Sequence, residues 1–147
     1  MRDLCSYVGA HYHLSSLQLI EMDGNTNDRV RFFYEANQNY TLGTLDRAER
    51  TEWNLVQGTT LDLPIATVID GEGVGRIDLD ANAAFNAANL TGLRGTEVTL
   101  ANNATLNAAG VTDFTNSKLT LGAGQAFHTA NLDQLEDARI EINGGVE

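Results

Sequence analysis

Charged residues recur at a fixed interval in the second half of this chain, and they are the first candidates for binding chemistry. Arg76, Glu97, Lys118 and Arg139 follow one another every 21 residues. In a chain of stacked coils these residues would lie side by side, and such a ridge could bind an oligosaccharide. Exposed ion pairs usually contribute less than about 1 kcal/mol each, so we favour a solvated face in which Glu97 approaches Arg76 and Lys118.

One polar segment resembles part of a calcium loop in its spacing. Asp23, Asn25 and Asn27 match the first three ligand positions of an EF-hand, where oxygen ligands alternate around the ion. The EF-hand also needs glycine at its sixth position and glutamate at its twelfth, and this chain has Asp28 and Tyr34 there. We therefore favour a polar turn and keep a calcium site at Asp23, Asn25 and Asn27 as the weaker alternative. No other cofactor is expected.

The remaining titratable residues do not form a catalytic pattern in the sequence. The segment His11–His13 would put two imidazoles on one side of a strand, but two histidines without a third ligand make a weak metal site. A polysaccharide-cleaving enzyme needs acidic or basic groups that converge on one groove. Asp78 and Asp80 fall in one repeat, whereas Arg94 and Lys118 occupy different positions of theirs. We expect a noncatalytic protein, with a polysaccharide lyase or hydrolase as the alternative.

Apolar residues repeat at the same interval and predict the elements that carry these side chains. The step of two at Ile77 and Leu79 predicts a short strand, and the same step at Ala88 and Leu90 predicts a second one. Equivalent strands of stacked units lie about 4.8 Å apart in parallel, so we predict an all-β protein, a parallel β-helix or solenoid with coils of about 21 residues. The columns are Ile77, Val98, Leu119 and Ile140; Leu79, Leu100, Leu121 and Ile142; Phe85, Leu106 and Phe127; Leu90, Val111 and Leu132; Leu93, Phe114 and Leu135; and Ala88, Ala109 and Ala130.

Amide side chains also recur at equivalent positions. Stacked asparagines can hydrogen-bond along a solenoid and satisfy the backbone of its turns, so we expect a structural role for them. The two columns are Asn86, Asn107 and His128, and Asn89, Gly110 and Asn131.

The first part of the chain lacks this period and holds seven of the ten aromatic residues. We predict an irregular, β-rich N-terminal cap over residues 1–57 and solenoid repeats over residues 58–147. The regular coils should begin at about Ile77. A shortened coil should precede them, because Leu63 and Ile69 lie only 16 residues before Leu79 and Phe85.

Two local elements are expected within the cap. The segments 17–22 and 30–34 are typical of strands, and the polar residues between them predict a turn that joins them into a hairpin. Thr44 is a suitable N-cap for a short helix that would bury Leu45, Ala48 and Leu55.

Composition limits the class of partner. The net charge of −11, from 9 basic and 20 acidic residues, argues against nucleic acid and against an anionic membrane surface. Cys5 is the single cysteine, so no disulfide forms within the chain. The first residues form no apolar segment and no stretch reaches about 18 apolar residues, so we expect neither a signal peptide nor a transmembrane helix within this sequence. The chain stops soon after Ile142, so we expect an open coil end that continuing coils or other copies would cover.

The repeat units resemble those of large bacterial surface proteins with parallel β-helix stalks. The three units are Phe85-Asn-Ala-Ala-Asn-Leu90-Thr-Gly-Leu93, Leu106-Asn-Ala-Ala-Gly-Val111-Thr-Asp-Phe114 and Phe127-His-Thr-Ala-Asn-Leu132-Asp-Gln-Leu135. The resemblance covers roughly residues 58–142 and implies a right-handed β-helix in an exported, adhesin-like protein at the cell surface or outside the cell. It carries no catalytic residues over to this chain.

Two other functions remain open from the sequence. A glycan-binding or carbohydrate-active β-helix would use the outward face, so glycans are a second class of partner. A leucine-rich-repeat-like solenoid would be a protein-recognition module. Its motif is echoed at Leu90 and Leu93 and again from Val98 to Asn103, although Val98 follows Leu93 by five positions, whereas the interval in that family is about two.

Overall fold

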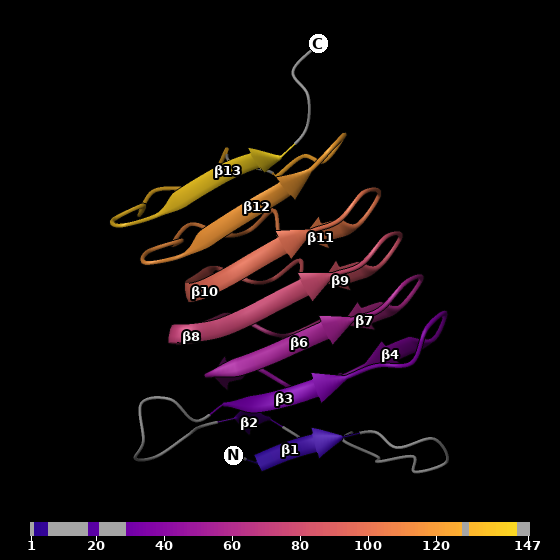
Figure 1. The fold of residues 1–147 in the computed structure, drawn as a ribbon. Helices are drawn as coiled ribbons and strands as arrows, with labels where there is room; N and C mark the ends of the chain where they lie inside the picture. The colour runs from indigo at the N-terminus through magenta and orange to yellow at the C-terminus, as the bar shows by residue number, and fades with distance from the viewer. Residues whose placement is uncertain (1, 6–17, 21–28, 128–129, 144–147) are drawn as a thin grey trace.

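The chain winds into coils whose short strands stack in parallel (Figure 1). The computed structural model describes residues 2–5, 18–20, 29–127 and 130–143, and it contains no helix among them. Figure 1 shows the strands rising one above the next from β1 at the N-terminal end to β13 at the C-terminal end. The prediction of an all-β parallel solenoid is confirmed.

Two parallel sheets make up the coils. The larger sheet runs in the order β1-β3-β6-β8-β10-β12-β13 and also contains β2 and β5, and the smaller sheet runs in the order β11-β9-β7-β4. The strands are β1 Arg2–Cys5, β2 Leu19–Ile20, β3 Val30–Phe33, β4 Asn39–Thr41, β5 Arg47–Glu49, β6 Thr51–Leu55, β7 Thr60–Asp62, β8 Val68–Leu79, β9 Ala84–Asn86, β10 Gly92–Leu100, β11 Thr105–Asn107, β12 Lys118–Gly122 and β13 Arg139–Asn143.

Each coil has three faces, because the long strands of the larger sheet continue around a corner. The first part of β8 pairs with β5, and its second part pairs with β6. We call the face formed by β1, β3, β6, β12, β13 and the second parts of β8 and β10 face A. The smaller sheet is face B. The face formed by β2, β5 and the first parts of β8 and β10 is face C.

The register confirms the 21-residue period and locates its exception. Val98 pairs with Leu119, and Leu119 pairs with Ile140, so equivalent residues are 21 positions apart. Earlier in the chain Tyr40 also pairs with Leu61 at an interval of 21. One coil departs from this period, because Leu61 pairs with Phe85 at an interval of 24. The extra residues lie at the corner within β8, where the register shifts between Asp70 and Gly75. The predicted 16-residue interval is therefore wrong, since this coil is longer than the others.

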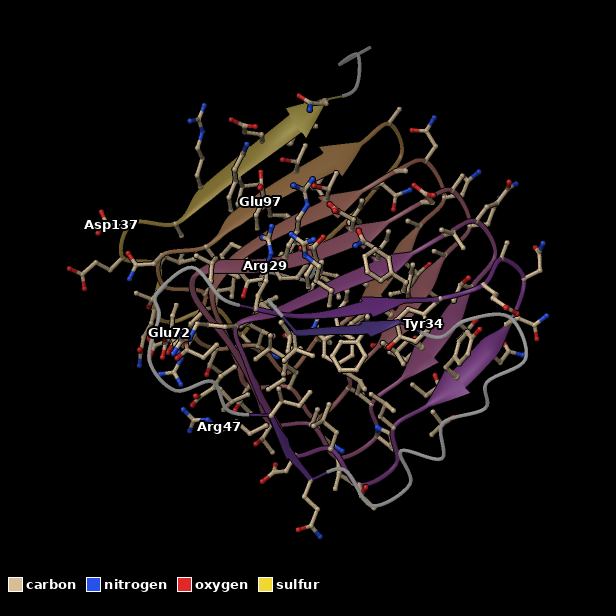
Figure 2. The ribbon with its side chains drawn as sticks, turned by 60° about the horizontal axis from the view of Figure 1, so that its bottom comes forward. Arg29, Tyr34, Arg47, Glu72, Glu97 and Asp137 are labelled. Atoms are coloured by element: carbon tan, nitrogen blue, oxygen red, sulfur yellow. The ribbon has the colours of Figure 1, made fainter. Side chains whose placement is uncertain are left out.

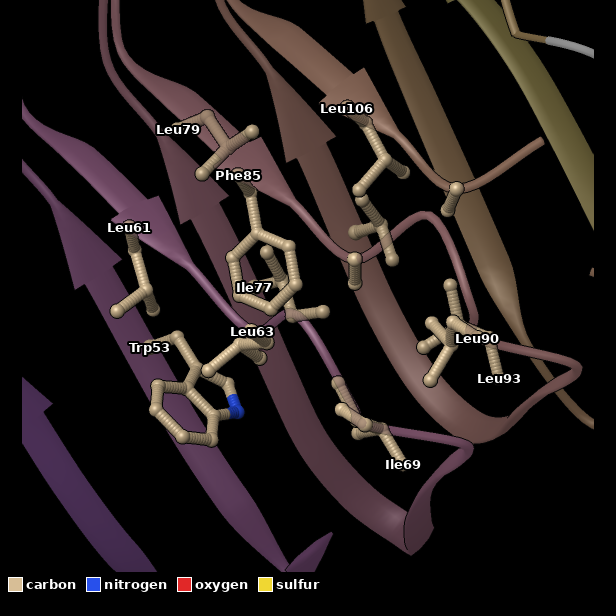
Figure 3. Packing of buried hydrophobic residues seen from close by; sticks show 14 of the residues in the cluster. Trp53, Leu61, Leu63, Ile69, Ile77, Leu79, Phe85, Leu90, Leu93 and Leu106 are labelled. Carbon is tan, nitrogen blue, oxygen red and sulfur yellow. The ribbon is translucent and has the colours of Figure 1, made fainter. Parts of the chain in front are cut away.

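Most of the predicted apolar columns form the core. Ile77, Phe85, Leu90 and Leu93 of one coil are fully buried, and Figure 3 shows them packed together with core residues of the neighbouring coils, such as Leu61 and Leu106. Tight interdigitation of this kind supplies most of the stability of a solenoid.

The alanine column is one residue away from the prediction. Ala87 and Ala108 point inward, whereas Ala88 and Ala109 are exposed in turns. The second strand of each unit accordingly precedes this position: β9 and β11 end at Asn86 and Asn107, and the residues after them turn the corner.

The predicted hairpin of the N-terminal part is wrong. β2 pairs in parallel with β5, and β3 pairs in parallel with β1 and β6. The polar segment expected to be its turn lies outside the described residues. Alternation of apolar residues identifies a strand, but it does not identify the neighbour that the strand pairs with.

The predicted short helix is also wrong, since its residues form β5 and β6. Leu45, Ala48 and Leu55 are buried, as expected, but they point into the solenoid from two faces. The ring of Phe32 stacks on that of Trp53 at 4.2 Å, so the aromatic residues form core layers of the same stack. Residue 58 marks no change of architecture, because β6 pairs directly with β8.

Left-handed residues turn the corner between faces A and B. Asn37, Gly58, Asn82, Asn103 and Gly124 all have positive φ angles and occupy equivalent positions. Asparagine and glycine adopt this conformation at the lowest cost, which explains why both occur in the column. A leucine-rich repeat combines a strand with a helix or 3₁₀ turn, so the absence of helix from the described coils overturns that alternative.

Candidate functional site

A ladder of charged residues runs along the outside of face A. The predicted column is in register: Arg76 is next to Glu97, Glu97 next to Lys118, and Lys118 next to Arg139. It also extends into the first part of the chain, because Glu52 pairs with Arg76. Figure 2 shows Glu97 and Arg29 over the strands of this face.

At the N-terminal end of the ladder one carboxylate holds two guanidinium groups. Glu52 Oε2 lies 2.7 Å from Arg29 Nε and 3.0 Å from Arg31 Nε. The Glu52 side chain is only 12% exposed, so these contacts are less screened by water than ordinary surface pairs. This pairing joins β6 to β3 and to the residue before it.

Further along, Lys118 bridges two coils. Its Nζ lies 3.1 Å from Glu141 Oε2 and 3.5 Å from Glu97 Oε1. Glu141 also pairs with Arg139, at 2.6 Å. The hydrogen bonds that Lys118 donates to Glu141 and then to Glu97 raise its pKa above the usual lysine value. The cation is therefore held protonated between the two carboxylates.

A groove of about 460 Å³ lies beside this ladder, along the corner between faces C and A. Its floor comes from short residues of successive corners, including Gly75, Gly95 and Ser117. Charged side chains border it on several coils: Arg29, Arg76, Glu97, Lys118, Asp137 and Arg139. Four of these six side chains are cationic, although the whole chain is strongly acidic. Positive charge thus gathers around this concave surface.

Hydrogen bonds to buried hydroxyls fix the floor of the groove. Ser117 Oγ donates to the carbonyl of Leu93 at 3.0 Å and accepts from the amide of Thr96 at 3.2 Å. Gly95 has a φ of 55°, and a Cβ at this position would lie 2.6 Å from the backbone nitrogen of Gly73. Only glycine allows these two corners to approach so closely.

Arg94 and Lys118, which an enzyme would need in one groove, lie on different faces of the solenoid. Asp78 is hydrogen-bonded by Arg76 on face A, and this contact raises the pKa of the arginine. Arg94 lies on face C, 3.5 Å from the carboxylates of both Asp70 and Asp113. Lys118 is on face A, so it shares no groove with Arg94. Each of these charges is balanced by a neighbour on its own face.

The candidate metal ligands cannot be placed. Asp23, Asn25 and Asn27 lie outside the described residues, as does the segment His11–His13. Elsewhere, in the part of the chain that the structure describes, no three His, Cys, Asp or Glu residues are grouped so that they could hold a metal ion.

The asparagine columns do join neighbouring coils, as expected. Asn89 Nδ2 donates to the carbonyl of Pro64 at 2.6 Å, and Asn131 Nδ2 donates to that of Ala109 at 2.7 Å. Asn86 donates to the Asp62 carboxylate at 2.7 Å. His128 lies outside the described residues. Asn89 and Asn131 thus satisfy turn backbone in the preceding coil, and Asn86 binds a carboxylate there, which fixes the register of the stack.

A threonine ladder at the corner between faces B and C was missed in the sequence. The hydroxyl of Thr67 donates to Asp46 Oδ1 at 2.8 Å. Thr91 and Thr112 donate to the carbonyl of the preceding threonine of the column, at 3.2 and 3.3 Å. The 24-residue interval between Thr67 and Thr91 hid this column from a search at a period of 21.

The C-terminal coil exposes its core layer. In one inward column Ile77, Val98 and Leu119 are fully buried, whereas Ile140 is 44% exposed. Ile142 in the next column is 69% exposed. β13 is hydrogen-bonded to β12 on one side, and its other edge has no partner among the described strands. This end combines an apolar surface with a free strand edge.

Comparisons with known proteins identify no relative of this chain. None of the described residues forms an apolar helix of the length needed to cross a membrane. No protein-family model, no curated protein and no solved structure matches the chain.

Proposed function

We propose that the protein is a noncatalytic β-solenoid module, a spacer or adhesive stalk segment of a larger exported bacterial surface protein. The observation that carries the proposal is the use of polar side chains to join coils. Lys118 reaches Glu97 and Glu141, and Asn131 reaches Ala109. Outward charges and amides that bind the neighbouring coil stabilise the stack and are not free to act on a substrate.

The location at the cell surface or outside the cell is part of the same proposal. It is supported by the resemblance of the repeat units to those of bacterial surface proteins with β-helix stalks. A stack of this kind extends by about 4.8 Å for each added coil, so its length can be set by the number of repeats. That property suits a protein that spaces a binding domain away from a surface.

Removal of one repeat tests the scaffold. Deletion of residues 98–118 joins Glu97 to Leu119, which keeps the register and leaves Glu97 between Arg76 and Arg139. We expect a folded protein that is one coil shorter and still unfolds cooperatively, as followed by circular dichroism. The matched control is deletion of residues 98–113, which destroys the register and should abolish folding. Complete unfolding of the 98–118 deletion would contradict the proposal, because each coil would then depend on more than its neighbours.

A second candidate function, glycan binding, is favoured by the groove beside face A. Its cationic border would attract an acidic polysaccharide, and the Arg139 side chain is the most available of these groups, at 72% exposure. The test is a screen of acidic and neutral polysaccharides for binding and for chain cleavage. If the groove binds an acidic chain, Arg139→Gln should weaken binding severalfold, whereas Arg47→Gln on face C should not. A protein that neither binds nor cleaves any of them would remove this candidate.

A further inference from the structure

The two ends of the larger sheet are both available for strand pairing. β1 and β13 are the outermost strands of face A, and within the described residues each pairs with another strand on one edge only. Unpaired strand edges bind other strands readily, because their backbone donors and acceptors are already aligned. In Figure 1 these two strands lie at opposite ends of the stack.

The apolar layer at the β13 end has the composition of an interior layer. Leu135, Ile140 and Ile142 are 48%, 44% and 69% exposed, whereas residues of the same columns in earlier coils are buried. An added coil would cover them with the same geometry that the stack already uses. At the opposite end, Leu4 occupies the register position next to Phe32, in the column that continues to Trp53 and ends at Ile140.

Charge distinguishes the partner that fits this end. In the register of face A, Asp3 is the partner of Arg31, and the charges at this position alternate in sign through Glu52, Arg76, Glu97 and Lys118. The alternation breaks at the last step, because Arg139 follows Lys118. An acidic residue beyond Arg139 would restore it, and like charges on adjacent strands are destabilising. The residue at the far end of this column, Asp3, is acidic.

We infer that a second copy of the chain binds head to tail, with its β1 edge pairing in parallel with β13. The register places Asp3 of the second copy next to Arg139, Leu4 next to Ile140, and Cys5 next to Glu141. This arrangement keeps each face stacked on the same face. In a two-fold, tail-to-tail contact the coil of the second copy would wind in the opposite direction, so face B of one copy would stack on face C of the other. The inference rests on the proposed scaffold function and names the partner of its open end.

The single cysteine allows a direct test of this register. Cys5 and Glu141 stand at the two ends of one column, so Glu141→Cys should bring two cysteines of different copies onto adjacent strands. Their Cα atoms would be about 4.8 Å apart, within the range of about 4.4–6.8 Å for disulfides. Under mild oxidation at high protein concentration, we expect a ladder of dimers, trimers and larger species on a non-reducing gel.

Matched variants separate this contact from other associations. Arg139→Cys lies two residues away along the strand, so its Cα would be about 8 Å from Cys5 and no ladder should form. The double variant Cys5→Ser, Glu141→Cys should run as a monomer on the same non-reducing gel, whereas a disulfide dimer would indicate tail-to-tail pairing and overturn the inference.

A folded Glu141→Cys protein without a ladder would also overturn the inference, and so would an equal ladder from Arg139→Cys. Circular dichroism of each variant establishes that it is folded. The deletion of residues 98–118 tests the scaffold separately. A deletion variant that folds, together with a Glu141→Cys variant that forms no ladder, would reject the head-to-tail contact while leaving the scaffold function standing.

Discussion

Ile77 and Ile140 occupy the same inward column of face A but differ in exposure, and this difference predicts unequal effects of the same substitution. Ile77 is fully buried between β6 and β10, where its register neighbours are Trp53 and Val98. Ile140 has Leu119 as its one described neighbour in the column and is 44% exposed. Substitution of each by alanine compares the middle of the stack with its end.

The expected magnitudes follow from burial. Replacement of a buried isoleucine by alanine costs about 2–5 kcal/mol, because the lost transfer free energy adds to that of the cavity left behind. Ile77→Ala should fall in this range. At Ile140 roughly half of the side chain is buried, and the open end leaves no closed cavity, so Ile140→Ala should cost only about 1–2 kcal/mol.

Urea denaturation measures both variants against the unchanged protein. Fluorescence of Trp53, the single tryptophan, reports on the first coils, while circular dichroism reports on the whole stack. Equal losses of unfolding free energy at low protein concentration would refute the reasoning, because the two positions would then be equally packed. If a second copy covers β13, the cost of Ile140→Ala should rise with protein concentration while that of Ile77→Ala stays constant.

Three further predictions concern charge, backbone conformation and pH. Arg139→Glu and Asp3→Arg should each weaken self-association in sedimentation, and a mixture of the two variants should restore it, because every contact then pairs opposite charges. Self-association that stays weak in the mixture would contradict the head-to-tail contact. The control is Asp80→Arg in the middle of the stack, which should leave self-association unchanged. Asn82 has a φ of 59°, so Asn82→Ala should lower the unfolding free energy by about 1 kcal/mol and Asn82→Gly by less; equal effects would argue against a backbone cause. The raised pKa of Lys118 predicts that its contribution to stability is fully present below the usual lysine value of 10.5 and is lost as pH rises through the higher folded value. NMR titration of its ammonium group, with Lys118→Met as the reference for stability, would detect the absence of this shift.

The candidate site was only partly accessible from the sequence. The charged column was found because its members keep one interval, and the structure confirms their register. The groove beside it was not foreseen, since its floor depends on how closely Gly95 approaches Gly73 at the corner. The threonine ladder was missed for a related reason: the extra residues within β8 change the interval between Thr67 and Thr91.

The N-terminal part shows where local patterns mislead. Its strand at 30–34 was predicted almost correctly, since β3 covers Val30–Phe33, but the neighbour assigned to it was wrong. Leu45, Ala48 and Leu55 suggested one face of a helix, and the structure buries them from two different faces. Burial pattern alone identifies which side chains leave water, and several backbone paths satisfy it.

By itself the sequence determined that this protein is a parallel stack, because apolar residues repeated every 21 positions can all be buried together only when equivalent strands lie side by side. The tertiary structure decided where each coil turns, which strands pair in the first part of the chain, and which columns stay exposed at the end. These features depend on backbone conformation at the corners and on contacts between residues 21 or 24 positions apart. Left-handed residues turn the corner between faces A and B, and Ile140 and Ile142 are exposed because no described strand pairs with the outer edge of β13.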